Sequence, residues 1–310
     1  ADEASLIYNY SPTIVAGHFQ EVNVYYHINE FQEYFQNTLG IANARNRVTD
    51  TYAHQGTDDN SDYSPSQDRI RYGDGGVDDS DDGEIVLHEY GHAVHNDIVP
   101  GFVYAAETGA ISEGFGDYFG ATYGGNALVG EWDAVSYNPG PPPFLRRTDT
   151  TKHYPEDIVG QVHSDGEIIS AAWWDFRNLV GGQIADQIII EGMFYTGVNA
   201  TFQDYADGMV AADQALYGGT HVGYIFQAFG GRGIGATYLL NFNHVALGDT
   251  EDNVGPYPVV TTISHTSPVS AADAVTLYFR ITGAVAWTPT TMVATGNFNE
   301  WAAQIPGQGN

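Results

Sequence analysis

Two histidines in this chain have the spacing that a metal site on a helix requires. His88 and His92 stand four residues apart in the run His88-Glu89-Tyr90-Gly91-His92, and residues four apart share one face of a helix. Two imidazoles presented in this way can bind one zinc ion, while Glu89 beside them can act as a general base toward water. A catalytic zinc ion also takes a third protein ligand and leaves one position open for water. The run therefore predicts two of the three protein ligands of a hydrolytic zinc site.

Glu113 is the candidate third ligand. It lies in an apolar stretch, 111–120, with Asp117 four residues further along. Two carboxylates on a largely apolar helix are costly to bury without partners, and a metal ion together with a histidine N–H would supply them. A motif of two histidines and a glutamate can arise by chance on an amphipathic helix. The second helix with its two carboxylates argues against that interpretation here.

The helices that must position these residues are predicted by the spacing of apolar residues. The metal-binding helix is expected over 83–97, with Glu84 in its first turn, where negative charge suits the helix dipole. A helix ended by Gly40 is expected before it, and the polar stretch 41–82 indicates short strands and loops. Later helices are expected over 167–179, 184–195, 201–216 and 222–229, and strands over 257–263 and 275–281.

Four further segments around the two helices carry a family likeness. They are 62–66, 72–79, 104–113 and 161–175, the last of which contains His163. With these segments the chain resembles the thermolysin-like zinc metallopeptidases, and most closely their secreted fungalysin-like branch, from about residue 18 to residue 248. The resemblance implies hydrolysis of peptide bonds in polypeptide substrates.

The same resemblance implies an α+β architecture, a two-lobed thermolysin-like zincin fold with a mainly helical C-terminal lobe. Residues 1–97 would form the N-terminal lobe that carries the zinc-binding helix, and 98–248 the mainly helical catalytic lobe. The cleft would lie between them. Residues 249–310 would follow as a β-rich, partial immunoglobulin-like module.

Catalytic roles follow from the resemblance for residues outside the zinc ligands. Glu89 would take a proton from the attacking water and pass it to the departing amine. Tyr104, nine residues before Glu113, and His163 would stabilise the developing oxyanion. Asp117 would fix the ring of the zinc ligand His88.

Substrate contacts are expected at two places. Asn60 and Ser61 stand where the family uses an edge strand to hold an extended peptide, although the same residues are equally typical of a polar turn. Either Arg146 or Arg147 would lie near the primed side of the cleft, and their adjacency leaves the choice open.

Composition indicates an acidic exported protein. The chain of 310 residues has 39 Asp and Glu against 10 Lys and Arg, a formal net charge of −29, and Lys152 is its single lysine. Such a charge disfavours binding to nucleic acid or anionic membranes, and suits a saline or cold habitat. Cysteine is absent, but a chain of this length can bury enough apolar surface without disulfides.

The N-terminal residues 1–5 lack the basic and then apolar pattern of a signal peptide. We therefore expect that a signal and an inhibitory pro-segment have been removed from a secreted, monomeric enzyme, and that no segment spans a membrane.

Several alternatives stay open. A zinc aminopeptidase and a catalytically inert protein of the same fold are the competing functions. Calcium is a second candidate ion because five aspartates gather ahead of the metal-binding helix: Asp74, Asp78, Asp79, Asp81 and Asp82. An acidic, solvated loop accounts for the same residues.

Overall fold

The computed structural model describes residues 18–137, 140–235, 241–248, 254–264, 275–280, 284–297 and 300–307. The N-terminal residues 1–5 lie outside them. The chain divides into two compact units, Ala1–Gly235 and Ala236–Asn310. The division of the first unit into lobes at residue 97 stays a prediction.

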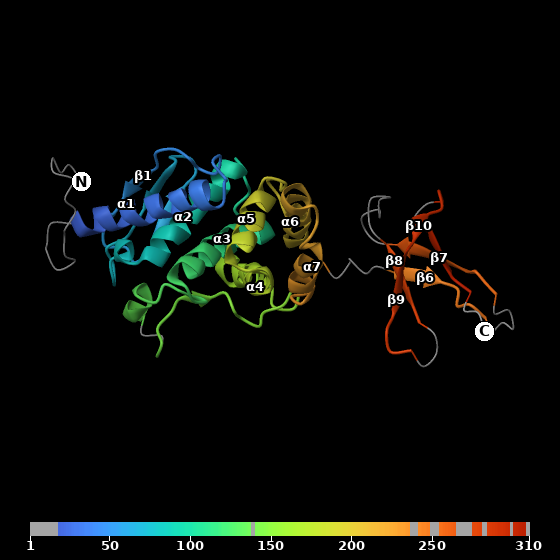
Figure 1. The fold of residues 1–310 in the computed structure, drawn as a ribbon. Coiled ribbons are helices and arrows are strands. Elements are labelled where there is room, and N and C mark those ends of the chain that lie inside the picture. The colour runs from blue at the N-terminus through green and yellow to red at the C-terminus, as the bar shows by residue number, and fades with distance from the viewer. Residues whose placement is uncertain are drawn as a thin grey trace. The chain divides into compact units, whose positions relative to one another are not determined.

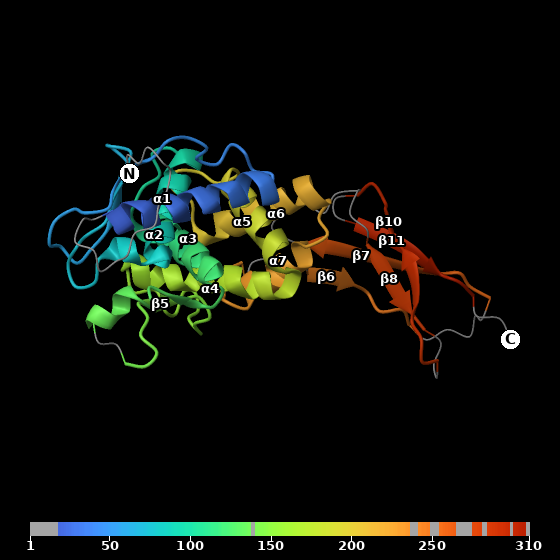
Figure 2. The same ribbon diagram turned by 60° about the vertical axis from the view of Figure 1, so that its left-hand side comes forward.

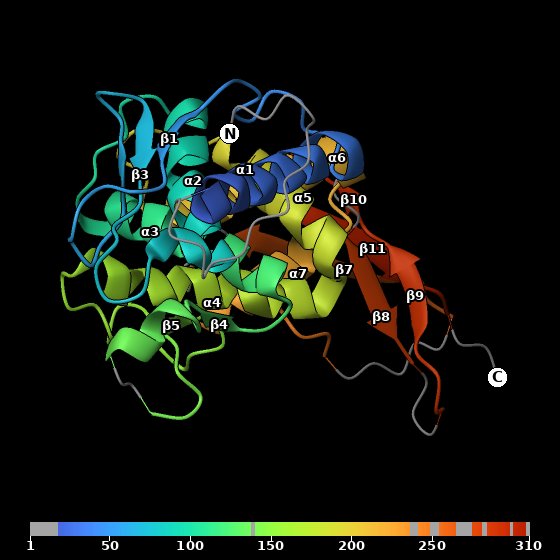
Figure 3. The same cartoon turned by 90° about the vertical axis from the view of Figure 1, so that its left-hand side faces the viewer.

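Helices make up most of the first unit, as Figure 1 shows. They are α1 (His18–Glu33), continued by the π-helical turn η1 (Tyr34–Thr38), α2 (Gly83–Ile98), α3 (Ala106–Gly124), α4 (Val162–Val180), α5 (Gly182–Met193), α6 (Phe202–Tyr217) and α7 (Val222–Gly230). The unit also contains two short 3₁₀ segments. The first, η2 (Asp79–Asp81), precedes α2 in the chain, and the second, η3 (Asp133–Tyr137), follows α3. The α3 helix packs between α2 and α4, and α1 covers α2 (Figure 3).

The start of α2 is set by a side-chain cap. Asp82 Oδ1 accepts hydrogen bonds from the backbone N–H groups of Glu84 (2.9 Å) and Ile85 (3.4 Å), which an N-terminal turn otherwise leaves unpaired. The helix ends at Ile98, and Pro100, which has no backbone N–H, follows. Every residue from Ile85 to His95 is buried, so the predicted metal-binding helix is a central element of the core.

Glycines allow α3 to approach both of its neighbours closely. A Cβ atom on Gly91 of α2 would lie 2.9 Å from Gly116 Cα of α3, and one on Gly114 of α3 would lie 2.7 Å from the Gly166 carbonyl oxygen of α4. Only glycine fits at such distances. The close packing brings the residues of all three helices toward a common cleft.

A small sheet lies ahead of α2, as the polar segment predicted. Its strands are β1 (Asp50–Tyr52), β2 (Asp62–Ser64) and β3 (Arg69–Arg71), in the order β1-β3-β2. Strand β2 pairs antiparallel with β3 and forms an edge of this sheet. A second pair, β4 (Leu128–Val129) and β5 (Arg146–Arg147), is antiparallel and follows α3 in the chain.

The second unit consists of strands, drawn in orange and red in Figure 2. They are β6 (Asn241–His244), β7 (Tyr257–Ser264), β8 (Thr276–Phe279), β9 (Thr288–Thr291), β10 (Val293–Ala294) and β11 (Glu300–Ile305). One sheet has the order β10-β11-β7-β6, and β8 pairs with β9. Val259, Ile263, Met292 and Trp301 form its apolar core. The unit is β-rich as predicted, and its immunoglobulin-like character stays a prediction.

The helices lie close to their predicted positions, with two informative differences. The α3 helix begins at Ala106 and ends at Gly124, and Gly125 caps it with a φ of 80°, so it is longer than the apolar stretch around Glu113 suggested. The α4 helix begins at Val162, ahead of the expected start, and His163 therefore belongs to its first turn. Within the described part of the chain, no helix is both long and apolar enough to cross a bilayer.

Candidate metal centre and active site

Three side chains from two helices converge at the predicted zinc site. The Nε2 atoms of His88 and His92 on α2 lie 3.2 Å apart. Glu113 on α3 places one carboxylate oxygen 3.2 Å from His88 Nε2 and the other 3.7 Å from His92 Nε2. All three side chains are buried, and Glu113 is 1% exposed.

The outer nitrogens of both imidazoles have acceptors, which sets how the rings are protonated. His88 Nδ1 lies 2.9 Å from Asp117 Oδ1, and His92 Nδ1 lies 2.8 Å from Ser112 Oγ. When each Nδ1–H donates to its acceptor, Nε2 carries a lone pair, and the two lone pairs are directed at the space between the rings and Glu113. Glu113 Oε2 has no hydrogen-bond partner there. Two imidazole lone pairs and a buried carboxylate that face one another fit a zinc ion, the metal that nitrogen and oxygen ligands of this set bind in catalytic sites.

The charges around the ligands follow from these contacts. Burial lowers the pKa of His92 to about 4, so this ring is neutral. Burial also acts to lower the pKa of His88, but the nearby carboxylates of Asp117 and Glu113 raise it to about 10. A metal ion and a proton compete for this nitrogen, as they do wherever metal binding is coupled to pH.

Glu89 lies beside the ligands and has the protonation behaviour of a base near neutral pH. It is 6% exposed, and its Oε2 atom has no hydrogen-bond partner. Burial raises the pKa of Glu89 to about 7; His88 opposes this shift and Glu113 adds to it. A carboxylate with a pKa near the working pH can both accept and return a proton.

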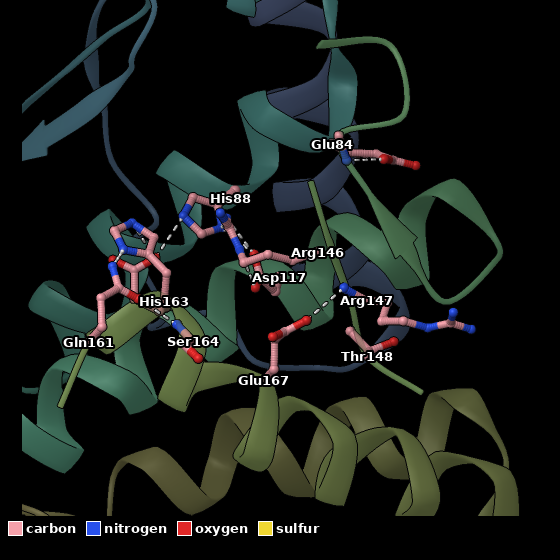
Figure 4. A network of polar contacts seen from close by, with 12 residues as sticks. Glu84, His88, Asp117, Arg146, Arg147, Thr148, Gln161, His163, Ser164 and Glu167 are labelled. Atoms are coloured by element: carbon pink, nitrogen blue, oxygen red, sulfur yellow. Dashed lines mark hydrogen bonds and ion pairs between the residues drawn. The ribbon is translucent and has the colours of Figure 1, made fainter. Parts of the chain in front are cut away.

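The partly buried Arg146 and the buried Asp117 form an ion pair behind His88 (Figure 4). Arg146 Nε and Nη2 donate to the two oxygens of Asp117 at 2.7 and 2.8 Å. Burial acts to raise the pKa of Asp117, but Arg146 and His88 lower it to about 2. Asp117 therefore stays charged and holds the His88 ring in place.

The two adjacent arginines point to different places, as Figure 4 shows. Arg146 lines the cleft, whereas the guanidinium of Arg147 pairs with Asp149 at 2.5 and 2.9 Å. Successive side chains of a strand such as β5 face opposite sides. The geometry places Arg146, and not Arg147, where a substrate could reach it.

His163 reaches the site from the first turn of α4, and Gln161 fixes its tautomer. Gln161 Oε1 accepts from the backbone N–H of Ser164 at 2.7 Å, which turns the Gln161 amide nitrogen toward His163 Nδ1, 2.7 Å away. Nδ1 must then accept, so the proton is assigned to Nε2. His163 Nε2 lies 3.3 Å from Glu113 Oε2, and burial lowers the pKa of His163. The ring is a neutral N–H donor directed into the site.

Tyr104 lies on the loop before α3 and donates its hydroxyl to Glu113 Oε1. Burial, together with the charge of Glu113, raises the pKa of Tyr104. Its hydroxyl therefore keeps its proton and remains a donor. The structure brings Tyr104 and His163, which are 59 residues apart in the chain, to the same carboxylate.

These groups line a cavity of about 570 Å³. Asn60 and Ser61, immediately before the edge strand β2, also line it. The Asn60 side chain donates to the Ser61 carbonyl at 2.8 Å, and Ser61 Oγ donates to Asp79 Oδ2 at 2.5 Å. Both expected substrate-binding residues thus lie at the cleft, and their role stays a prediction.

Three residues of the site were not expected from the sequence. Ser112 holds His92, Gln161 holds His163, and Asp133 lines the cavity from η3. The sequence contains a weak signal for the first two, because Ser112 adjoins Glu113 and Gln161 occupies the position before the helix start. The sequence around Asp133 contains no pattern that predicts its place at the site.

The five aspartates proposed for calcium do not gather around one point. Asp82 caps α2, Asp74 and Asp78 group with His54, and Asp79 groups with Asp59 and Asp133. Asp81 belongs to neither group. Calcium binding stays a prediction.

Comparison with known proteins agrees with this arrangement. The fold is similar to that of the precursor of protealysin, a metalloproteinase from Serratia proteamaculans, with a TM-score of 0.59 and 16% sequence identity over 73% of this chain and 80% of that one. The first unit thus has the thermolysin-like fold. Residues 73–238 match the model of the fungalysin metallopeptidase family (M36), and this chain belongs to that family.

Curated relatives include extracellular metalloproteinases of fungi. Extracellular metalloproteinase 2 of Trichophyton rubrum is 27% identical over 199 residues, 52% of this chain and 31% of the relative. Extracellular metalloproteinase 3 of Arthroderma otae is 28% identical over 189 residues, 49% of this chain and 30% of the relative. This chain spans about a third of the length of the curated relatives it matches.

Proposed function

We propose that this protein is a secreted zinc-dependent endopeptidase. The observation that carries the proposal is the convergence of His88 Nε2, His92 Nε2 and the Glu113 carboxylate within 3.2 to 3.7 Å of one another, beside Glu89 in an open cleft. The family of metallopeptidases to which the chain belongs supports the reaction class. The names of the extracellular relatives support export.

Different residues of the site carry out different parts of the proposed reaction. A zinc ion held by His88, His92 and Glu113 would supply Lewis acidity that lowers the pKa of water and polarises the peptide carbonyl. Glu89 takes a proton from the attacking water and returns it to the amine that leaves.

Two donors face the place where negative charge develops. The Nε2–H of His163 and the hydroxyl of Tyr104 both point toward Glu113, and each can turn from that carboxylate to a substrate oxygen. Gln161 maintains the donating tautomer of His163 without a change of charge. Such preorganised donors stabilise an oxyanion at little reorganisation cost.

The peptide would lie along the cleft between β2 and the α3–α4 side. Among the described residues, strand β2 is an edge strand of its sheet, and an extended peptide can join such an edge by backbone hydrogen bonds. Arg146 can donate to a peptide carbonyl while it remains paired with Asp117, because a guanidinium has five N–H donors. We extend the proposal to a monomer released from a pro-segment, a feature that the precursor form of the protealysin relative suggests.

The test is cleavage of an internally quenched peptide with both ends blocked. Chelation should abolish cleavage and added zinc should restore it. The Glu89→Gln variant should lose about 10²–10⁴-fold in kcat and keep its zinc content, measured by atomic absorption. Glu156→Gln, a substitution at an exposed glutamate, is the matched control and should keep full activity.

Two results would contradict this proposal. Turnover retained by Glu89→Gln would remove the general base from the mechanism. Cleavage confined to peptides with a free amino terminus would indicate an aminopeptidase instead.

A further inference from the structure

Three carboxylates gather in the cleft at a distance from the metal ligands. They belong to Asp59 in the loop before β2, Asp79 at the start of η2 and Asp133 at the start of η3, and one ligand atom of each lies within 4.8 Å of the others. All three line the same cavity as His88 and Glu89. We call them the carboxylate cluster.

One carboxylate of the cluster lacks a partner that a buried charge requires. Asp79 and Asp133 are each 3% exposed. Asp79 Oδ2 accepts from Ser61 Oγ, whereas Asp133 Oδ1 has no hydrogen-bond partner among the described residues. Burial raises the pKa of Asp133 to about 7 and that of Asp79 to about 6, and Asp59 adds to both shifts. A cation between the three would remove this repulsion.

The backbone holds the cluster in place despite the repulsion. The N–H of Asp133 donates to Asp82 Oδ2 at 3.0 Å, and the N–H of Asp79 donates to the Gly73 carbonyl at 3.1 Å. Because Asp82 is also the N-cap of α2, the cluster is tied to the helix that carries His88.

Two aliphatic side chains line the same cavity as the cluster and the catalytic residues. Ile85, one turn before His88 and Glu89 on α2, and Leu145, next to Arg146, both line the cavity. They meet over Gly130, where an added Cβ would lie 2.8 Å from Leu145 and 3.2 Å from Ile85. The Gly130 carbonyl accepts from Ala134 N–H at 3.0 Å, which places Asp133 beside this aliphatic wall.

We infer that this part of the cleft is a subsite for a lysine or arginine side chain of the substrate, at a position that flanks the scissile bond. The inference rests on the proposed peptidase function. The methylene groups of such a side chain would pack on Ile85 and Leu145 while its cationic end reaches the cluster. An ammonium group has three N–H donors, and bonds of about 2.8 Å to three acceptors separate those acceptors by about 4.5 Å. A divalent cation is the competing occupant, but it would leave the aliphatic wall without a role.

The test compares kcat/KM for blocked, quenched peptides that carry Lys, Leu or Glu at each of the two positions flanking the scissile bond. At one position Lys should exceed Leu by roughly tenfold to a hundredfold, and Glu should be slowest, because charge-assisted hydrogen bonds in a buried site are strong. Asp133→Asn and Asp59→Asn should each lower the Lys-to-Leu ratio by about tenfold. Asp59 is exposed, so its variant tests the subsite without a risk to folding.

Asp50→Asn is the matched control, since Asp50 is an exposed aspartate on β1, and it should leave the Lys-to-Leu ratio unchanged. Equal or better cleavage of Leu peptides at both positions, with ratios unaffected by the two variants, would overturn the inference and leave the peptidase function standing. Stoichiometric calcium binding to the zinc-loaded protein by calorimetry, lost in Asp133→Asn and accompanied by no Lys preference, would also overturn it. Absence of cleavage of every peptide would overturn the peptidase function and the inference with it.

Discussion

At the residue scale, each catalytic histidine has a neighbour that decides where its proton sits. Ser112 and Asp117 engage the Nδ1 atoms of His92 and His88, which leaves Nε2 free to bind a metal. Gln161 does the reverse for His163, because its amide donates to Nδ1. In the proposed site, histidine would therefore serve as a metal ligand at two positions and as a hydrogen-bond donor at a third, and the hydrogen-bond partner of each ring makes the difference.

Replacement of Gln161 should separate catalysis from helix capping. Gln161→Ser can still cap α4 but is too short to reach His163, so we expect kcat to fall by about tenfold, less than the 10²–10³-fold typical for loss of an oxyanion donor. The free energy of unfolding in urea should change by less than about 1 kcal/mol because a cap is retained. His163→Ala is the reference for complete loss. Equal kcat in Gln161→Ser and the wild type would show that the tautomer does not depend on Gln161.

At the element scale, the distance between α2 and α3 is set by glycine. A Cβ on Gly116 would lie 2.7 Å from both Nδ1 and the carbonyl oxygen of His88. The packing of the two helices and the position of the proposed ligand His88 therefore both depend on the lack of a Cβ atom at Gly116. Sequence motifs that name only the ligands omit this requirement.

Gly116→Ala should therefore weaken metal binding. Overpacking of this kind typically costs about 1–3 kcal/mol, and displacement of a group beside a ligand lowers metal affinity by about 10–100-fold. Zinc affinity can be measured by competition with a chromophoric chelator. Gly223→Ala on α7 is the control, since a Cβ there has no heavy atom within 4 Å. Unchanged zinc affinity in Gly116→Ala would show that the helices can separate without loss of the site.

The segments that precede and follow the metal-binding helices should make stability depend on pH. Asp79 and Asp133 have a raised pKa in the folded protein, about 6 and about 7, so the folded state holds more protons than the unfolded chain between about pH 4 and pH 7. Their contribution to stability is therefore present at low pH and is lost as the pH rises through the folded pKa values.

Asp133→Asn removes one of these titrations. Relative to the wild type it should gain stability as the pH is raised from about 4 to 8, on the order of 1–2 kcal/mol. Urea unfolding at several pH values measures the difference, and Asp50→Asn serves as the exposed control. A difference between Asp133→Asn and wild type that stays constant with pH would contradict this account.

At the scale of the whole molecule, a formal net charge of −29 must be accommodated. Some of the aspartates and glutamates are paired with the few cations, as in the Arg146–Asp117 pair and the Lys152–Glu167 pair. Ten Lys and Arg cannot neutralise 39 acidic residues, so mutual repulsion opposes the compact state.

Salt should therefore stabilise the protein. An increase from about 0.05 M to 1 M NaCl shortens the screening length from more than 10 Å to about 3 Å, and we expect Tm to rise by several degrees. Thermal melts followed by circular dichroism measure this. The same melts at about pH 4.5, where carboxylates are partly protonated, should show a smaller rise. A Tm independent of salt at neutral pH would indicate that the surface carboxylates are already compensated.

Local spacing in the sequence was sufficient to predict the helices and the residues that lie together on one helix face. His88 and His92 share a face because the helix repeat is a property of the backbone, and Asp117 follows Glu113 for the same reason. The acidic composition and the absence of cysteine are likewise properties of the sequence that need no structure. The rest of the predicted site, including Tyr104 and His163, was inferred from the similarity to fungalysin-like enzymes.

Contacts between residues far apart in the chain could be identified from the folded structure alone. It placed Arg146 at the cleft and Arg147 away from it, although the two are adjacent. It also brought Asp59, Asp79 and Asp133 together from three separate segments. Such convergence depends on how helices and turns pack, and packing is fixed by contacts between residues far apart in the chain, for which no local period gives a signal.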